Sequence, residues 1–301
     1  MDETGILTLA TNDDYRKAIG LALSARRATP GLPLAIACAK EIIPKVGEFF
    51  DTVIEERTGL RGFEHKLFVD EYSPFERTLF LDADVLVFRD LRPTLAAWRG
   101  CAYTARGGYA SEGVSAFGLD RRYVLSRIEK EKLVVIGGAG HAYFEKPECH
   151  AVFRKAREIG AEYDRFANPC RFSDEDVMGI AMTILDLEPM PNNSFHARLR
   201  HAKKGTIEMN VVDGRCRFRD DHTGEIVEPT IVHFAGMEGP FLYHRELARL
   251  ARSSGAPHRK TWLLDALREY VTTAVWWRLK SGIRTAYDSA RRPTRESASA
   301  Q

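Results

Sequence analysis

The sequence predicts an α/β fold with a mainly parallel sheet flanked by helices, followed by a helical C-terminal extension. Short apolar runs alternate with amphipathic stretches in the first part of the chain, which is typical of strand–helix–strand units. Of the 301 residues, 44% are hydrophobic, which suffices for a sizeable core. Asp82 and Asp84 separate two apolar runs, at a position where α/β sheets bind ligands.

Four strands are predicted before the aspartate pair, and the fourth ends directly at it. They are expected at 5–10, 34–38, 52–55 and up to Leu81, with helices at 13–27, 42–50 and 63–68. Asn12 or Asp13 serves as the N-cap of the first helix. A short strand at 85–88 follows the pair. Thr11 and Asn12, like Asp82 and Asp84, lie where a strand ends, which favours a ligand site there.

The second half of the chain is less regular. Strands are expected at 102–105, 133–136, 142–144 and 230–234, and helices at 148–159 and 177–185. The segment 107–115 is predicted to be small and flexible. Ser173 followed by Asp174, Glu175 and Asp176 has the pattern of an N-cap and an acidic first helical turn.

Charge and cysteine content argue against several classes of protein. The 44 basic and 42 acidic residues give a net charge of +2, so nucleic-acid binding is not expected. Five scattered cysteines without a C-x-x-C pattern predict free thiols in a reducing compartment and no zinc site. We recognise no signal peptide and no run of about 20 apolar residues, and therefore expect a cytoplasmic location.

The domain organisation expected from the sequence has three parts. Residues 1–250 form the globular domain, 251–292 a helical extension and 293–301 a disordered tail. In the extension, Trp276 and Trp277 stand beside Arg278 and Lys280. Such a helix either lies on the cytoplasmic face of a membrane or packs on the domain as its last helix, and the second interpretation is preferred.

A divalent cation explains the two aspartates at a strand end. An unpaired buried carboxylate is costly, whereas a hard cation accepts oxygen ligands from both side chains. The alternative is a polar turn that faces solvent.

Three further segments accompany this Asp82-Ala-Asp84 motif. They are Thr8-Leu-Ala-Thr-Asn-Asp-Asp-Tyr15, Asp174-Glu-Asp-Val-Met178 and His233-Phe-Ala-Gly236-Met-Glu-Gly-Pro240. In that order and spacing, the chain resembles the glycogenin-like family 8 glycosyltransferases, from about residue 5 to about residue 245. The resemblance implies a GT-A fold, with a Rossmann-like sheet, and a nucleotide-sugar donor, usually a UDP-sugar. It also implies Mn²⁺ as the cofactor, with Mg²⁺ as the alternative, and retention of anomeric configuration.

The family motifs imply roles for particular residues. Leu9, Thr11, Asn12 and Tyr15 match the uridine-binding motif, with Tyr15 stacking on the base or else buried against the sheet. Asp82, Asp84 and His233 match the metal ligands, although a single histidine after a strand is often structural. Asp174 matches an acidic residue facing the donor sugar, the expected catalytic position. The donor-binding set is completed by Asp82, Ala83, Gly138, Ala139 and Gly236.

The sequence also departs from the family pattern. Glu175 replaces a glutamine, Gly138 an asparagine, Gly239 a phosphate-binding lysine and Phe241 a tryptophan. Lys66 can supply a phosphate-binding cation instead, or can be a solvated helix lysine; Arg106 is a weaker candidate.

These departures keep alternatives open. A catalytically weak sugar-nucleotide-binding protein is one, and a haloacid-dehalogenase-like phosphatase, suggested by Phe80-Leu-Asp-Ala-Asp84, is another. The acceptor is expected to be a glycan, a lipid-linked sugar or a small molecule.

Overall fold

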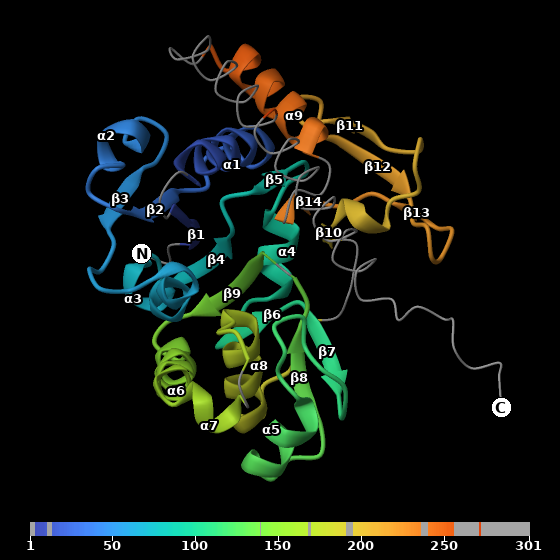
Figure 1. Cartoon of the computed structure of the whole chain (residues 1–301). Coiled ribbons are helices and arrows are strands. Elements are labelled where there is room, and N and C mark those ends of the chain that lie inside the picture. The colour runs from blue at the N-terminus through green and yellow to red at the C-terminus, as the bar shows by residue number, and fades with distance from the viewer. Residues whose placement is uncertain are drawn as a thin grey trace, which may run out of the picture. The chain divides into compact units, whose positions relative to one another are not determined.

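The computed structural model describes residues 4–10, 14–138, 140–167, 170–190, 195–235, 240–255 and 271. The chain divides into two compact units, residues 1–239 and 240–301, which are treated separately (Figure 1).

The elements of the first unit follow the expected alternation up to the aspartate pair. In chain order they are β1 (Thr4–Ala10), α1 (Tyr15–Ala28), β2 (Leu34–Cys38), α2 (Ile43–Val46), β3 (Thr52–Glu55), the 3₁₀ helix η2 (Gly62–Phe68), α3 (Val69–Tyr72), β4 (Arg77–Leu81) and β5 (Val85–Val87).

The remaining elements of this unit are shorter strands and helices of varied length. They are α4 (Arg92–Ala97), β6 (Tyr103–Ala105), β7 (Gly107–Ala110), α5 (Arg121–Ile128), β8 (Leu133–Ile136), β9 (His141–Glu145), α6 (Cys149–Ala161), α7 (Tyr163–Phe166), α8 (Asp174–Ile184), β10 (His196–Ala197), η3 (Leu199–His201), β11 (Glu208–Asn210), β12 (Arg215–Arg219), β13 (Ile226–Val227) and β14 (Ile231–His233).

The central sheet has six strands in the order β3-β2-β1-β4-β9-β6 (Figure 1). β1, β2, β3 and β4 are parallel, while β9 runs antiparallel to both of its neighbours. The mainly parallel sheet predicted from the sequence is thus confirmed. The carboxyl ends of β1 and β4 and the amino end of β9 therefore share one edge, and this edge carries the site.

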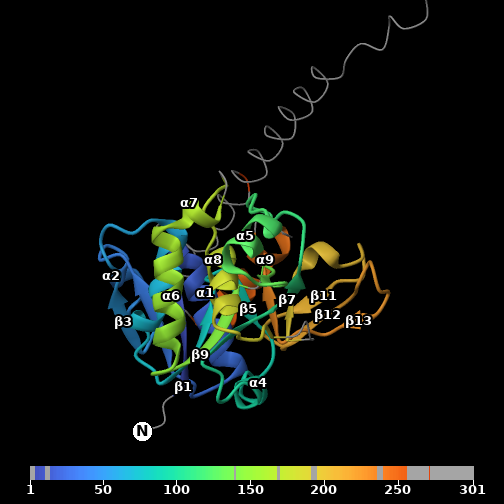
Figure 2. The same ribbon diagram turned by 90° about the horizontal axis from the view of Figure 1, so that it is seen from below.

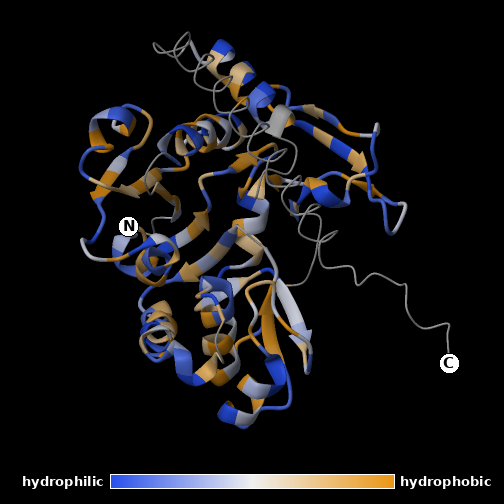
Figure 3. Ribbon diagram, in the orientation of Figure 1, coloured by the Kyte–Doolittle hydropathy of each residue, from blue (hydrophilic) through white to orange (hydrophobic). Residues whose placement is uncertain are grey.

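Both faces of the sheet are covered, which explains why its strands are apolar along their whole length. Leu7, Phe80 and Phe144 face α6 and α8, where Phe153 and Val177 belong to the same buried cluster. Figure 2 shows α6 and α8 side by side. The hydropathy colouring in Figure 3 shows apolar and polar residues alternating along α6, as expected for a helix with one buried face.

The opposite face is built around α1 and β5. The Ser24 hydroxyl of α1 accepts a hydrogen bond of 3.1 Å from the Val87 N–H of β5. β5 belongs to a second sheet, ordered β10-β14-β5, in which β14 is antiparallel to β5 and parallel to β10. This small sheet joins the chain after the aspartates to a segment far away in the sequence.

Four sequence predictions need correction. The first helix begins at Tyr15 with Asp14 at its N-cap, where Asn12 or Asp13 was predicted, and the Asp14 side chain makes no capping hydrogen bond. The segment 107–115 is not a flexible stretch throughout, because β7 pairs antiparallel with β8 and covers Gly107–Ala110. The helix expected at 42–50 is only Ile43–Val46, with Gly47 at its C-cap. The helix at 63–68 is a 3₁₀ helix that continues into α3.

The second unit contains α9 (Pro240–Ser253). Within the described residues, no helix is both long and apolar enough to cross a membrane. The predictions for the helical extension and the tail, including Trp276, Trp277, Arg278 and Lys280, lie outside the described residues, and so does Phe241 beyond its backbone.

Candidate active site

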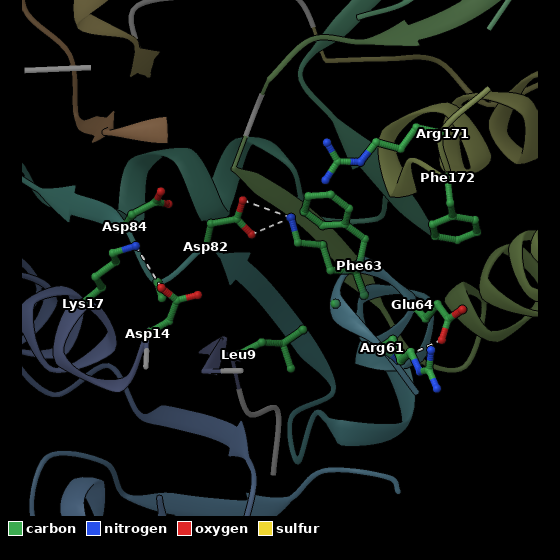
Figure 4. A pocket seen from close by; sticks show the side chains of 13 residues that line it. Leu9, Asp14, Lys17, Arg61, Phe63, Glu64, Asp82, Asp84, Arg171 and Phe172 are labelled. Atoms are coloured by element: carbon green, nitrogen blue, oxygen red, sulfur yellow. Dashed lines mark hydrogen bonds and ion pairs between the residues drawn. The ribbon is translucent and has the colours of Figure 1, made fainter. Parts of the chain in front are cut away.

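A cavity of about 520 Å³ opens at the carboxyl edge of the central sheet (Figure 4). Its lining comes from β1, the start of α1, η2, the turn after β4 and the segment before α8. The lining residues are Leu9, Asp14, Lys17, Arg61, Gly62, Phe63, Glu64, Lys66, Asp82, Ala83, Asp84, Arg171 and Phe172.

The two aspartates occupy a tight turn between β4 and β5. The Val85 N–H donates to the Asp82 carbonyl at 3.0 Å, and the Asp82 N–H donates to the Gly140 carbonyl at 2.8 Å. The turn directs both carboxylates toward the cavity, where the Asp82 and Asp84 side chains keep only 18% and 23% of their exposure. The solvent-facing turn considered from the sequence is therefore only half right, because the turn is present but the carboxylates are largely covered.

Strand register brings His233 to this turn. β14 pairs with β5 so that His233 lies opposite Val85, and the Phe234 N–H donates to the Asp84 carbonyl at 3.1 Å. The His233 Nε2 atom lies 3.1 Å from Asp84 Oδ1 and 3.7 Å from Asp82 Oδ2. The predicted proximity of these three side chains is confirmed.

A hydrogen bond fixes which nitrogen of His233 faces the carboxylates. Nδ1 lies 3.1 Å from the Gly138 carbonyl, which can only accept, so Nδ1 carries the proton. The Nε2 lone pair is then directed at the aspartates when the ring is neutral. This arrangement is how proteins orient a metal-binding histidine.

Gly140 is required beside this ring. A Cβ atom at Gly140 would lie 2.6 Å from His233 Nδ1, and the residue has a φ of +57°, where side chains are disfavoured. Gly138 has a φ of +52° and lies against the Arg198 guanidinium. Gly140 thus packs closely against the histidine ring, and the Gly138 carbonyl contacts its Nδ1 atom.

The three side chains fit a divalent cation. One ligand atom from each of Asp82, Asp84 and His233 lies within 4.8 Å of the others, and two carboxylates with one imidazole suit Mn²⁺ or Mg²⁺. Burial tends to raise the pKa of Asp84, but the His233 hydrogen bond and charge lower it overall. Burial tends to lower the pKa of His233, but Asp84 and Asp82 raise it overall. Both shifts favour an imidazolium–carboxylate pair when no metal is bound.

Lys66 connects this group to Asp174. Its Nζ atom lies 2.9 Å from Asp82 Oδ1 and 3.3 Å from Asp174 Oδ2. Burial tends to lower the Lys66 pKa, but Asp174 and Asp82 raise it, so the ammonium is held charged. The alternative of a solvated helix lysine is wrong. Partly buried ion pairs contribute little net stability, which favours a functional reason for this arrangement.

Two adjacent carboxyl groups begin α8 next to Lys66. The Ser173 side chain caps the helix by accepting from the Asp176 N–H, as the sequence predicted. Burial raises the pKa of Asp174, and burial together with Asp174 raises that of Glu175. The Glu175 carboxylate also accepts a hydrogen bond from the Gly138 N–H. Gly138 therefore contacts both Glu175 and His233 through its backbone.

The residues expected to bind the nucleotide are only partly described. Leu9 and Ala83 line the cavity, whereas Thr11, Asn12, Ala139 and Gly236 lie outside the described residues. Tyr15 is absent from the described lining, and Lys45 Nζ lies 4.7 Å from its ring centroid. Arg106 does not line the cavity either, and its Nη1 atom donates to His196 Nδ1 at 2.7 Å.

Sequence reasoning missed eight of the thirteen lining residues, namely Asp14, Lys17, Arg61, Gly62, Phe63, Glu64, Arg171 and Phe172. Arg61 and Phe63 precede Lys66 on or beside η2, and Arg171 and Phe172 directly precede Ser173. Their closeness in sequence to Lys66 and to Asp174 is the signal that could have identified them.

Comparison with solved structures defines the class of fold. The bifunctional glycosyltransferase WbbM in its apo form matches 87% of this chain and 51% of its own length, with a TM-score of 0.56 and 12% identity. The galactosyltransferase LgtC, solved with donor and acceptor sugar analogs, matches 83% of this chain and 95% of its own length, with a TM-score of 0.51 and 16% identity. Apo GlyE, a glycosyltransferase of Streptococcus pneumoniae, matches 93% of this chain and 64% of its own, with a TM-score of 0.50 and 10% identity.

The fold is therefore the GT-A fold of these glycosyltransferases. The chain spans about half of WbbM but nearly all of LgtC. No protein-family profile and no curated protein sequence matches it.

Proposed function

We propose that this protein is a metal-dependent glycosyltransferase that transfers a sugar from a nucleotide diphosphate sugar, a UDP-sugar, to an acceptor with retention of configuration. The observation that carries the proposal is the Asp82–Asp84–His233 group, whose two aspartates line a cavity at the carboxyl edge of a GT-A sheet. The fold it shares with WbbM, LgtC and GlyE supports sugar transfer, and the four ordered motifs support family 8.

Asp82, Asp84 and His233 would hold Mn²⁺ or Mg²⁺ in this proposal. When bound, the cation neutralises the diphosphate leaving group as the sugar–phosphate bond breaks. The Gly138 carbonyl accepts a hydrogen bond from the His233 Nδ1–H, which leaves Nε2 facing the two aspartates and available to a cation. Leu9 lines the cavity and is a proposed contact of the base, together with Thr11, Asn12 and Tyr15.

The donor sugar would lie between Lys66 and the start of α8. Lys66 lies 3.3 Å from Asp174 and opposes the rise in the Asp174 pKa that burial causes, which favours a carboxylate facing the developing positive charge of the sugar. Glu175 accepts a hydrogen bond from the Gly138 N–H, which fixes the orientation of this carboxylate at the position where the family pattern has an asparagine. Asp174 is accordingly the proposed catalytic residue.

The test is release of UDP from UDP-sugars by the full chain, with and without Mn²⁺. We expect turnover that requires the cation and is abolished by chelator. Cation-dependent UDP binding without release from any UDP-sugar would favour the binding-protein alternative. Hydrolysis of simple phosphomonoesters would point to the phosphatase.

A further inference from the structure

The cavity has two chemically different sides. In Figure 4, Asp84, Lys17 and Asp14 lie on one side, Asp82 lies near the centre, and Phe63, Arg171, Phe172, Arg61 and Glu64 lie on the other. We call the group Arg61, Phe63, Arg171 and Phe172 the outer wall. It combines aromatic rings with guanidinium groups, and Glu64 beside it accepts a hydrogen bond from the Arg61 N–H. We call the side with Asp82 and Asp84, together with His233 that contacts them behind the lining, the metal end.

The outer wall is held in place by its own contacts. The Arg171 N–H donates to the Phe117 carbonyl at 3.1 Å, and the Arg171 guanidinium lies 5.9 Å from the Phe117 ring centroid. The same ring packs edge-on against Phe63 with centroids 6.1 Å apart. Phe117 thus positions both the cation and the ring that flank the cavity. The Phe172 ring packs against the Tyr163 ring, with the two ring centroids 5.2 Å apart.

Arg171 differs from the lysines of the cavity in its charge partners. Lys17 pairs with Asp14 at 2.8 Å, and Lys66 pairs with Asp82 and Asp174. In the part of the chain that the structure describes, no carboxylate forms an ion pair with the Arg171 guanidinium. A guanidinium at a cavity wall without a carboxylate partner is suited to bind an external phosphate or carboxylate bidentately.

The aromatic rings beside Arg171 add a second requirement. Phe63 keeps 37% of its exposure, and an exposed ring at a cavity wall gains by covering the apolar C–H face of a ligand. A pyranose ring has such a face. The ligand favoured by this wall therefore combines a sugar ring with an anionic oxygen group.

We propose that the outer wall binds the acceptor, and that this acceptor is a sugar bearing a carboxylate or phosphate that Arg171 recognises while Phe63 and Phe172 contact the ring. The inference rests on the proposed function. In that function the diphosphate of the donor belongs at the metal end, on the other side of Asp82, so the anion at Arg171 is a second one. Arg171 then selects the acceptor and does not bind the donor.

The experiment uses the full chain saturated with UDP and Mn²⁺, and measures the binding of three sugar probes by saturation-transfer NMR titration. Methyl glucuronide supplies a carboxylate, glucose 6-phosphate a phosphate, and methyl glucoside is the neutral reference. We expect a charged probe to bind at least about tenfold more tightly than methyl glucoside, and Arg171→Gln to remove that preference. The better of the two charged probes identifies the anionic group.

Two control variants make the result specific. Arg165→Gln removes an exposed arginine of α7 that pairs with Glu162 and does not belong to the described cavity lining, and this variant should retain the preference. Phe63→Leu should weaken all three probes alike, because it removes the ring and keeps the guanidinium.

Equal binding of charged and neutral probes by the unmodified protein would overturn the inference. A loss of UDP affinity in Arg171→Gln, measured in the same samples, would also overturn it, because the guanidinium would then serve the donor. Absence of cation-dependent UDP binding in the unmodified protein would instead refute the proposed function, while charge-selective probe binding would still support the anion site.

Discussion

The metal end and the outer wall of the cavity are held in place by different means. At the metal end, backbone pairing between β5 and β14 places His233 beside Asp84, and Gly138 and Gly140 fix the ring. At the outer wall, side chains from η2 and from the segment before α8 meet through the Phe117 ring. The register of β14 against β5 fixes the position of His233, whereas the side-chain contacts around Phe117 tolerate substitution. The difference suits a fixed chemical centre and a variable specificity surface.

The largest effect is expected from Asp84→Asn at the metal end. The change removes one anionic ligand but keeps the backbone carbonyl that accepts from Phe234, so the fold should persist. We expect UDP release from a UDP-sugar to fall by at least about 100-fold, a size typical of losing electrostatic stabilisation of a leaving group. Asp90→Asn, an exposed carboxylate just beyond β5, is the matched control. Near-normal turnover by Asp84→Asn would contradict the metal assignment.

Gly140→Ala tests whether the glycine loop positions His233. The added methyl would collide with the ring and would also sit at positive φ. Gly205→Ala separates these effects, because Gly205 has a φ of +78° with nothing within 4 Å of the added atom. We expect Gly140→Ala to lower the free energy of unfolding by about 2 kcal/mol more than Gly205→Ala, the usual size of overpacking. Urea denaturation measures this, and equal losses would show that the ring tolerates the contact.

The pH dependence of metal binding provides a third test. The pKa of His233 is raised above its ordinary value by Asp84, so the imidazolium competes with the cation at and above pH 6.5. Mn²⁺ affinity should fall by about tenfold per pH unit below the folded pKa, because ligation requires loss of one proton. Calorimetric titration at several pH values measures this slope.

Metal-free stability should depend on pH with the opposite sign. A raised histidine pKa contributes stability that is fully present below the unfolded pKa and is lost as pH rises through the folded pKa. The free energy of unfolding without metal should therefore decrease over that window, while with Mn²⁺ present it should increase. His222→Gln, at an exposed histidine, should leave both trends unchanged. A metal affinity that does not vary with pH would exclude His233 as a ligand.

The smallest effect is expected at the outer wall. Phe117→Leu keeps an apolar side chain but removes the ring that contacts both Phe63 and Arg171. We expect UDP affinity to stay within about twofold and the acceptor KM to rise by about three- to tenfold, corresponding to loss of one aromatic contact. Steady-state kinetics with a charged acceptor sugar measures the acceptor KM, and UDP inhibition in the same assay measures the UDP affinity. A larger effect on UDP affinity than on the acceptor would remove the contrast between the two regions.

Much of the metal end was predictable from the sequence. The apolar runs that become β1, β2, β3 and β4 are short and bounded by polar segments, and Asp82 and Asp84 stand at a strand end. The position of His233 beside them depends on pairing between strands far apart in the sequence. The sequence predicts the position of His233 only through the resemblance to a family, because local patterns carry no information on the pairing of distant strands.

The outer wall was not predictable in the same way. Arg61, Phe63, Arg171 and Phe172 belong to two segments with no shared pattern, and Phe63 and Arg171 meet through contacts of both with Phe117. The pairing of β7 with β8 was missed for a related reason. Gly107 and Gly108 lower the strand propensity, and tertiary pairing overrides that local preference.

The central claim is that Asp82, Asp84 and His233 hold a divalent cation that also binds the donor diphosphate. Electron paramagnetic resonance titration of Mn²⁺, with and without UDP, tests it most directly on the unmodified protein and on Asp84→Asn. In this account UDP contacts the bound Mn²⁺, so the two ligands must strengthen each other's binding to the protein by the same factor. UDP should therefore tighten Mn²⁺ binding by at least about tenfold in the unmodified protein and have little effect in the variant. Equal Mn²⁺ binding by the two proteins, or Mn²⁺ binding that ignores UDP in the unmodified one, would contradict the account.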